Sequence, residues 1–114
     1  PELRQTLDTF YMTRVGIRML IGQYLELFEP ARKGYIGLVN TETSPAHVAQ
    51  AAIEDASYIC DREHGDYPEV IIEGRTDLHF PYVPSHLFYI LVELLKNRCA
   101  ENVRKTQQCY LFVT

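Results

Sequence analysis

The chain has 114 residues, enough for one modest domain or pieces of two, with the hydrophobic (46%) and charged (23%) content of an ordinary globular protein. The net charge of −4, without a basic run, points away from nucleic acid, and no apolar stretch approaches a membrane span. The three cysteines are odd in number and form no Cys-x-x-Cys pair, which favours a reducing compartment over a disulfide framework. Because the chain begins at Pro1 without a recognisable signal or transit segment, we interpret it as an internal piece of a longer chain.

The first predicted element is a long helix from Glu2 to about Phe28. Its apolar residues fall near two stripes, one with Leu3, Leu7, Phe10, Ile17, Ile21, Tyr24 and Phe28, and one with Met12, Val15 and Met19. A helix that is apolar on two sides is typical of the interior of a helical bundle. Arg14 and Arg18 share a face, and we expect them to pair with acidic groups of a neighbouring helix.

A helix break follows at residues 29–34, where Pro30 and Gly34 place a candidate domain boundary. The run Tyr35–Val39 predicts a short strand. A second helix should then begin at Pro45, with Ser44 as its cap. Its buried side should carry Val48, Ala52, Ile53, Ala56 and Ile59.

Gly65 is expected to end this second helix, since glycine is common just past a helix. Acidic and imidazole side chains cluster there, at Asp61, Glu63, His64 and Asp66. A solvated helix end accounts for this cluster better than a metal site does. Further along, Glu69–Glu73 alternates as a strand would, and Leu78–Tyr82 forms another extended piece.

The most informative stretch runs from Tyr82 to Asn97. It predicts a mostly buried helix with Pro84 in its first turn, Ser85 helping to cap that turn, and a core face of Leu87, Ile90, Leu91 and Leu94, widened by Phe88, Val92 and Leu95. A polar stripe nevertheless follows the helix, with His86, Tyr89, Glu93, Lys96 and Asn97. Because Glu93 and Asn97 lie four residues apart, they project from one side. Spacing alone allows two interpretations, an exposed polar stripe or a site for a bound metal–nucleotide.

Two motifs resemble those of a known family. Glu93-Leu-Leu-Lys-Asn97 resembles the N-box of the histidine-kinase-like (GHKL) ATPases. Together with Val83-Pro-Ser-His-Leu87 and with the helix Tyr11-Met-Thr-Arg-Val-Gly-Ile-Arg-Met-Leu-Ile-Gly-Gln23, it is similar to the mitochondrial kinases of 2-oxoacid dehydrogenases. The stretch Tyr11–Gln23 contains no His, so phosphorelay through this helix is not expected.

The resemblance implies an α+β fold, in which the end of an all-α helical bundle is followed by the first part of a GHKL-type α/β sandwich. It divides the chain into residues 1–29, the last bundle helix, residues 30–97, the start of the ATP-binding domain, and residues 98–114, a divergent tail. It also implies ATP and Mg²⁺ as cofactors. Glu93 would be the base for a substrate serine, Asn97 a Mg²⁺ ligand, and Lys96 would lie near the nucleotide.

The sequence departs from the family after Asn97. Ala100 stands where the family has an arginine that contacts nucleotide, and neither an Asp-x-Gly-x-Gly motif nor a Gly-rich lid follows up to Thr114. A gene-model error, an alternative splice or a deliberate truncation could produce such a tail. We therefore expect this chain by itself to be inactive.

The implied function is phosphorylation and inactivation of the E1α subunit of the pyruvate dehydrogenase complex in the mitochondrial matrix. Partners would be the E1 component, the lipoyl-bearing E2 core and, in a full-length parent, a second kinase subunit. Val83–Leu87 favours a pyruvate dehydrogenase kinase, whereas Tyr89-Ile-Leu91 and Glu93–Asn97 favour the branched-chain 2-oxoacid dehydrogenase kinase. Two further alternatives are a truncated, non-catalytic binding module and an unrelated α+β domain.

Overall fold

The computed structural model describes residues 2–102 and 109–113, and the side chains of residues 2–98 and 109–113. The described residues form a mixed α+β structure of three helices and two small sheets, which confirms the predicted fold class at this level. In chain order the elements are α1 (Glu2–Glu26), β1 (Tyr35–Ile36), β2 (Val39–Thr43), α2 (Pro45–His64), β3 (Val70–Gly74), β4 (Phe80–Tyr82), α3 (Pro84–Asn102) and β5 (Cys109–Val113).

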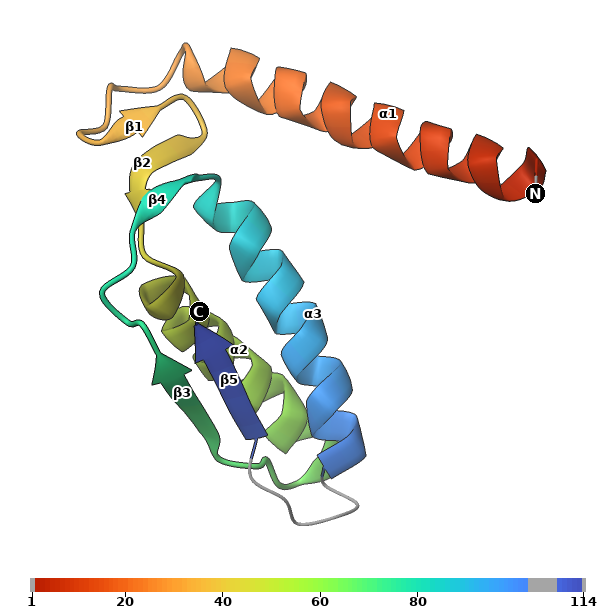
Figure 1. Ribbon diagram of the computed structural model, residues 1–114, viewed down its shortest axis with the longest axis vertical. Coiled ribbons are helices and arrows are strands. Elements are labelled where there is room, and N and C mark those ends of the chain that lie inside the picture. Colours follow the sequence, from red (N-terminus) through yellow and green to blue (C-terminus); the bar gives the residue numbers. More distant parts are fainter. Residues whose placement is uncertain (1, 103–108, 114) are drawn as a thin grey trace.

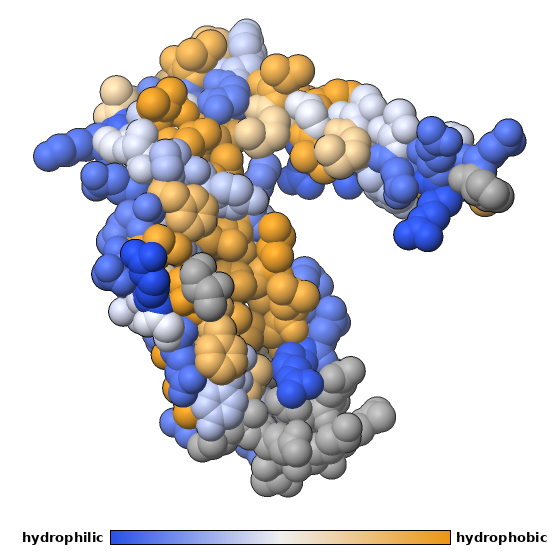
Figure 2. Space-filling model, in the orientation of Figure 1, coloured by the Kyte–Doolittle hydropathy of each residue, from blue (hydrophilic) through white to orange (hydrophobic). Residues whose placement is uncertain are grey.

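Helix α1 projects away from the paired helices α2 and α3, so the molecule is open in shape (Figure 1). Its radius of gyration is 17.0 Å, whereas a compact domain of this length has about 13 Å. The long helix itself was predicted correctly, but none of its residues is buried. Its apolar stripes are exposed because the described residues supply no second bundle helix to cover them, and hydrophobic surface is visible along α1 and over α3 (Figure 2).

The predicted strand Tyr35–Val39 is in fact a hairpin. Gly37, with φ of 60°, begins a two-residue turn, so that β1 ends at Ile36 and β2 begins at Val39. A glycine at the first central position is the usual choice for such a turn because it accepts positive φ. The turn explains why one predicted strand became two short antiparallel ones, and β2 continues to Thr43.

Helix α2 has the limits that its capping residues predict. The Ser44 hydroxyl accepts a hydrogen bond from the backbone N–H of His47 at 3.3 Å, and Pro45 occupies the first turn. Gly65 adopts the left-handed conformation, with φ of 73°, and its N–H donates to the Asp61 carbonyl at 2.7 Å. Local side-chain chemistry therefore fixes both ends of this helix.

Two sheets support the helices. β2 lies between β1 and β4 and pairs antiparallel with both, while β3 and β5 pair in parallel, with α3 as the crossover between them. The fully buried Thr43 hydroxyl donates to the carbonyls of Asn40 and Tyr82, which satisfies this polar group where β2 and β4 meet. The sequence predicted β3 and the extended segment at β4, but it did not predict β5 in the tail.

The core lies between α2 and α3, which run side by side in the same direction (Figure 1). Three of the residues predicted for α2, Ala52, Ile53 and Ala56, pack there against Val92 and Leu95 of α3. The strand residues Val70 and Ile72 and the α3 residues Phe88 and Leu91 complete this cluster from the sides.

The predicted core face of α3 was partly wrong. Ile90 and Leu94 are 49% and 59% exposed, whereas Val92 and Leu95 are 8% and 4% exposed. The reason is that α2 covers only one side of α3, and the described residues provide no cover for the side that carries Ile90 and Leu94. Ser85 is also not the cap, because it lies inside the first turn and the Val83 carbonyl accepts the N–H groups of His86 and Leu87.

No helix in residues 2–102 is both long and apolar enough to cross a membrane.

Leu95→Ala is expected to lower the free energy of unfolding of the chain by about 2–5 kcal/mol, because it removes a buried side chain from the α2–α3 contact. The neighbouring Leu94→Ala is the matched control, and it should change stability by about 0.5 kcal/mol or less because Leu94 is exposed. Equilibrium unfolding in urea measures both. Equal losses in the two variants would contradict the observed orientation of α3.

Candidate functional site

The candidate site lies on α3, beside the contact that holds this helix in place. Val92 and Leu95 point into the core against α2, so Glu93, one position further around the helix, points away from the core. Asn97 lies one turn after Glu93, and both side chains are exposed. The helix therefore brings the predicted carboxylate and carboxamide together on one side, as their spacing requires.

Lys96 joins this group through an ion pair that was not predicted. Its ammonium donates a hydrogen bond to Oε1 of Glu93 at 2.8 Å. The Glu93 side chain is 64% exposed and that of Lys96 is 34% exposed, so the pair is at the surface. The (i, i+3) spacing of a glutamate and a lysine on a helix was the signal for this pair in the sequence.

The electrostatic setting of Lys96 favours its charged form. The hydrogen bond to Glu93 raises the pKa of Lys96 above its ordinary value of 10.5, partial burial opposes this, and the charges of Glu93 and Glu63 add to it. Glu63 belongs to the last turn of α2. The ammonium therefore lies within the field of carboxylates from both helices.

The chemistry of these side chains fits the implied cofactors. Mg²⁺ takes hard oxygen ligands, binds through one or two protein groups, and completes its coordination with water and phosphate oxygens. Glu93 and Asn97 supply such oxygens from one side of a helix, and Lys96 supplies a cation of the kind that contacts phosphate. Tyr89, 66% exposed and one turn before Glu93, belongs to the same stripe.

A cluster of acidic and imidazole side chains lies near Asp61 at the end of α2. In the part of the chain that the structure describes, no three His, Cys, Asp or Glu side chains are grouped so that they could hold a metal ion. All four residues of this cluster are exposed: Asp61, Glu63, His64 and Asp66. The side chain of Ala100, which stands at the family's arginine position, is outside the described side chains.

A cavity of about 530 Å³ lies at the other end of α3, where the start of α2, strand β2 and the segment before β4 converge. Its lining residues come from several separate segments: Tyr35, Asn40, Glu42, Thr43, Ser44, His47, Val48, Thr76, His79 and Pro84. Sequence reasoning missed this cavity because no local motif connects residues so far apart in the chain.

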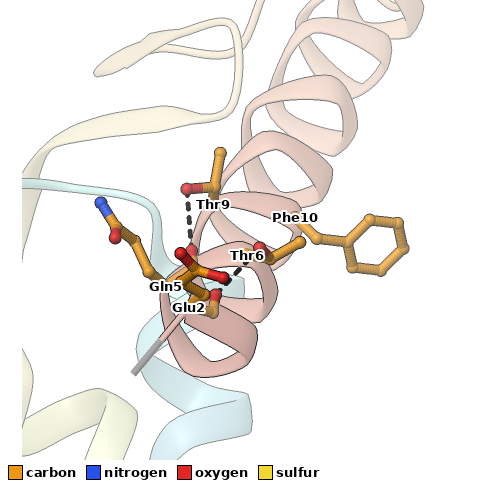
Figure 3. Close-up of a pocket in the computed structure, with 5 residues that line it drawn as sticks. All are labelled: Glu2, Gln5, Thr6, Thr9 and Phe10. Atoms are coloured by element: carbon orange, nitrogen blue, oxygen red, sulfur yellow. Dashed lines mark hydrogen bonds between the residues drawn. The ribbon is translucent and has the colours of Figure 1, made fainter.

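A second hollow lies on α1 (Figure 3). All of its lining residues, Glu2, Gln5, Thr6, Thr9 and Phe10, belong to this one helix, so no second element encloses it. The Thr6 and Thr9 hydroxyls each donate to the carbonyl four residues earlier, at 3.0 Å. These hydroxyls are engaged by their own helix, and the hollow is an open surface groove.

Comparisons with known proteins relate the sequence of this chain to one family. The family model of the mitochondrial branched-chain alpha-ketoacid dehydrogenase kinase matches residues 1–40. The mitochondrial [pyruvate dehydrogenase (acetyl-transferring)] kinase of Arabidopsis thaliana is 50% identical over 97 residues, which cover 84% of this chain and 26% of that protein. The corresponding kinase of Schizosaccharomyces pombe is 44% identical over 94 residues, or 80% of this chain and 22% of that protein, and isozyme 1 of Mus musculus is 36% identical over 102 residues.

The chain belongs to the family of mitochondrial 2-oxoacid dehydrogenase kinases. This confirms the resemblance that the two motifs indicated. The chain spans about a quarter of the length of these kinase relatives. A stretch that covers 84% of the chain must include residues 19–96, so Glu93 and Lys96 lie within the region matched by the plant kinase.

In this kinase-family segment, Glu93→Gln is expected to move the pKa of Lys96 down toward 10.5, because it removes the charge that faces the ammonium. The raised pKa means that the pair stabilises the folded chain at neutral pH, and that this contribution is lost as the pH rises through the folded-state pKa of Lys96. An NMR titration of the Lys96 side chain measures the shift. Glu63→Gln is the control and should have a smaller effect; an unchanged Lys96 pKa in Glu93→Gln would contradict the ion pair.

Proposed function

We propose that this chain is part of an ATP-dependent protein-serine kinase of the mitochondrial matrix that phosphorylates, and thereby inactivates, the E1α subunit of the pyruvate dehydrogenase complex. The observation that carries the proposal is the 50% identity with a mitochondrial pyruvate dehydrogenase kinase over a region that includes residues 84–96 of α3. The kinase activity, the substrate and the location follow from the names of the relatives, and they concern the whole protein of which this segment is a part.

We infer that α1 is the last helix of a helical bundle and that the residues from β1 onward begin a GHKL-type α/β sandwich. Two observations support this division. The apolar stripes of α1 are exposed and suited to other helices, and α2 and α3 form one layer beside the parallel strands β3 and β5. The boundaries remain those that the sequence predicted, at residues 29 and 97.

The proposed chemistry assigns one role to each polar residue of α3. The Glu93 carboxylate accepts the proton of the substrate serine hydroxyl as its oxygen forms a bond to the transferred phosphorus. The Asn97 side-chain oxygen holds Mg²⁺, and Lys96 lies near the phosphates of the nucleotide. ATP, when bound, would supply the phosphoryl group, and ADP would leave as the bond to the transferred phosphorus breaks.

The ion pair gives Lys96 a second part in this scheme. Its ammonium donates to Oε1 of Glu93 and so holds the carboxylate in one rotamer on the outward side of α3. This arrangement is that of the chain without nucleotide. A nucleotide phosphate that binds the ammonium competes with this hydrogen bond, which would couple the presence of nucleotide to the release of the base.

The proposed partners are the E1 component, the lipoyl-bearing E2 core and a second kinase subunit. A branched-chain 2-oxoacid dehydrogenase kinase is the runner-up function, favoured by the family model that matches residues 1–40 and by Tyr89. Transfer assays of the full-length parent with each E1 component distinguish the two substrates. The identity of the plant and yeast relatives favours pyruvate dehydrogenase.

In the full-length parent, Glu93→Gln is expected to lower the rate of transfer by about 10²–10⁴, since it removes the general base while retaining the side-chain shape. Binding of Mg–ATP should be largely unchanged, because no phosphate contact is lost. Transfer of labelled phosphate to E1 and calorimetry with ATP measure the two quantities. Normal turnover in this variant would remove Glu93 from the proposed role.

Asn97→Ala provides the contrast in the same assays. It should weaken Mg–ATP binding about tenfold or more. The reason is that loss of a residue that only supports a metal ligand already lowers metal affinity about 10–100-fold, and Asn97 would be a ligand itself. Unchanged Mg–ATP affinity would contradict the assignment of Asn97.

A further inference from the structure

Helix α1 touches the rest of the described chain through a short face at its C-terminal end, which shares only Met19 with the apolar stripes. All of its residues are exposed except Met19, Gly22, Gln23 and Glu26, which are half-buried. Their spacing of three, four and seven residues places them on one side of the last two turns. Within this contact face, Gly22 and Gln23 lie against Gly37 and Leu38, the turn residues of the β1–β2 hairpin.

One side-chain hydrogen bond lies at the centre of this contact. Oε1 of Gln23 accepts the backbone N–H of Leu38 at 3.1 Å, in a partly buried position. This N–H belongs to the hairpin turn, between β1 and β2. The Gln23 carboxamide therefore supplies an acceptor to a turn amide from a residue fifteen positions earlier in the chain.

Glycines on both sides permit this close approach. A Cβ added at Gly22 would lie 2.5 Å from Cδ1 of Leu38, and one added at Gly37 would overlap the carboxamide of Gln23. Glycine inside a helix is costly relative to alanine, so Gly22 is explained by this contact rather than by helix formation.

A second link runs along the same face. Nη2 of Arg32 pairs with Oε2 of Glu26 at 2.7 Å, and the guanidinium lies 4.3 Å from the centre of the Tyr35 ring in β1. This link is more exposed than the Gln23 contact, so we expect it to contribute less to the orientation of α1.

We propose that Gln23 is a positioning residue that fixes the angle between α1 and the α/β unit by holding the β1–β2 turn against the helix. The turn is continuous with β2, which leads directly into α2 and pairs with β4, which in turn leads into α3. The orientation of α1 is thereby tied to the starting points of both helices of the core. This inference is independent of the proposed kinase function.

Gln23→Met tests the contact between α1 and the hairpin turn, because it keeps the length of the side chain and removes the hydrogen-bond acceptor. Residual dipolar couplings of backbone amides in the 114-residue chain report the mutual orientation of α1 and the pair α2–α3. In the unchanged chain one alignment tensor should fit both groups. In Gln23→Met the two groups should require different tensors, and hydrogen exchange at the Leu38 amide should rise roughly fivefold, as expected for loss of one hydrogen bond.

Three further variants make the outcome specific. Gln5→Met, the same substitution at an exposed position of α1, should leave a single tensor. Gln23→Glu should also keep a single tensor, because a carboxylate can accept the same N–H. Gly22→Leu raises the helix propensity of α1 and places a branched side chain in the space of the Leu38 side chain, so it should separate the tensors without unfolding the helix. This last variant decides the matter if Gln23→Met does not fold. A single tensor in Gly22→Leu and in a folded Gln23→Met, or two tensors in the unchanged chain, would overturn the proposal.

Discussion

The contact between α2 and α3 is the constraint on which the rest of the α/β unit depends. Ala52 and Ala56 are fully buried on α2, and their small side chains allow α3 to approach closely enough for Val92 and Leu95 to fill the space between the helices. This packing sets the rotation of α3 about its own axis. Once residues 92 and 95 face the core, Glu93 and Asn97 must lie on the outer side of the helix, while Lys96, one turn after Val92, lies half-buried between the two sides.

Local chemistry predicted much of the fold, and tertiary packing decided the remainder. Ser44 and Gly65 mark the ends of α2 because capping depends on residues next to one another in the chain. The rotation of α3 could not be predicted, since the run from Leu87 to Leu95 is apolar on nearly every side and periodicity selects no single face. The hairpin was missed for a related reason. Residues 35–39 have the composition of one short strand, and the turn at Gly37 becomes evident only from the pairing of β1 with β2.

The candidate site shows the same division. Its residues could be proposed from the sequence because the motif Glu93–Asn97 is contiguous and resembles that of a family, and the helix period places Glu93 and Asn97 on one side. The cavity that includes His47 and His79 assembles only when distant segments meet, and the contact of Gln23 with Leu38 joins a helix to a turn fifteen residues later. Helix α1 and α3 both retain exposed apolar surface, which agrees with a segment that spans about a quarter of the length of its relatives.

We propose that α3 presents Glu93 and Asn97 to a magnesium-bound nucleotide. A crystal structure of the full-length parent with Mg²⁺ and a non-hydrolysable ATP analogue tests it directly, through the distance between Mg²⁺ and Oδ1 of Asn97. We expect this distance to be about 2.0–2.1 Å, the value for an oxygen ligand of Mg²⁺, with the Glu93 carboxylate directed at the space beyond the terminal phosphate. A bound nucleotide whose metal has no contact with Asn97, and whose terminal phosphate is remote from Glu93, would contradict the account.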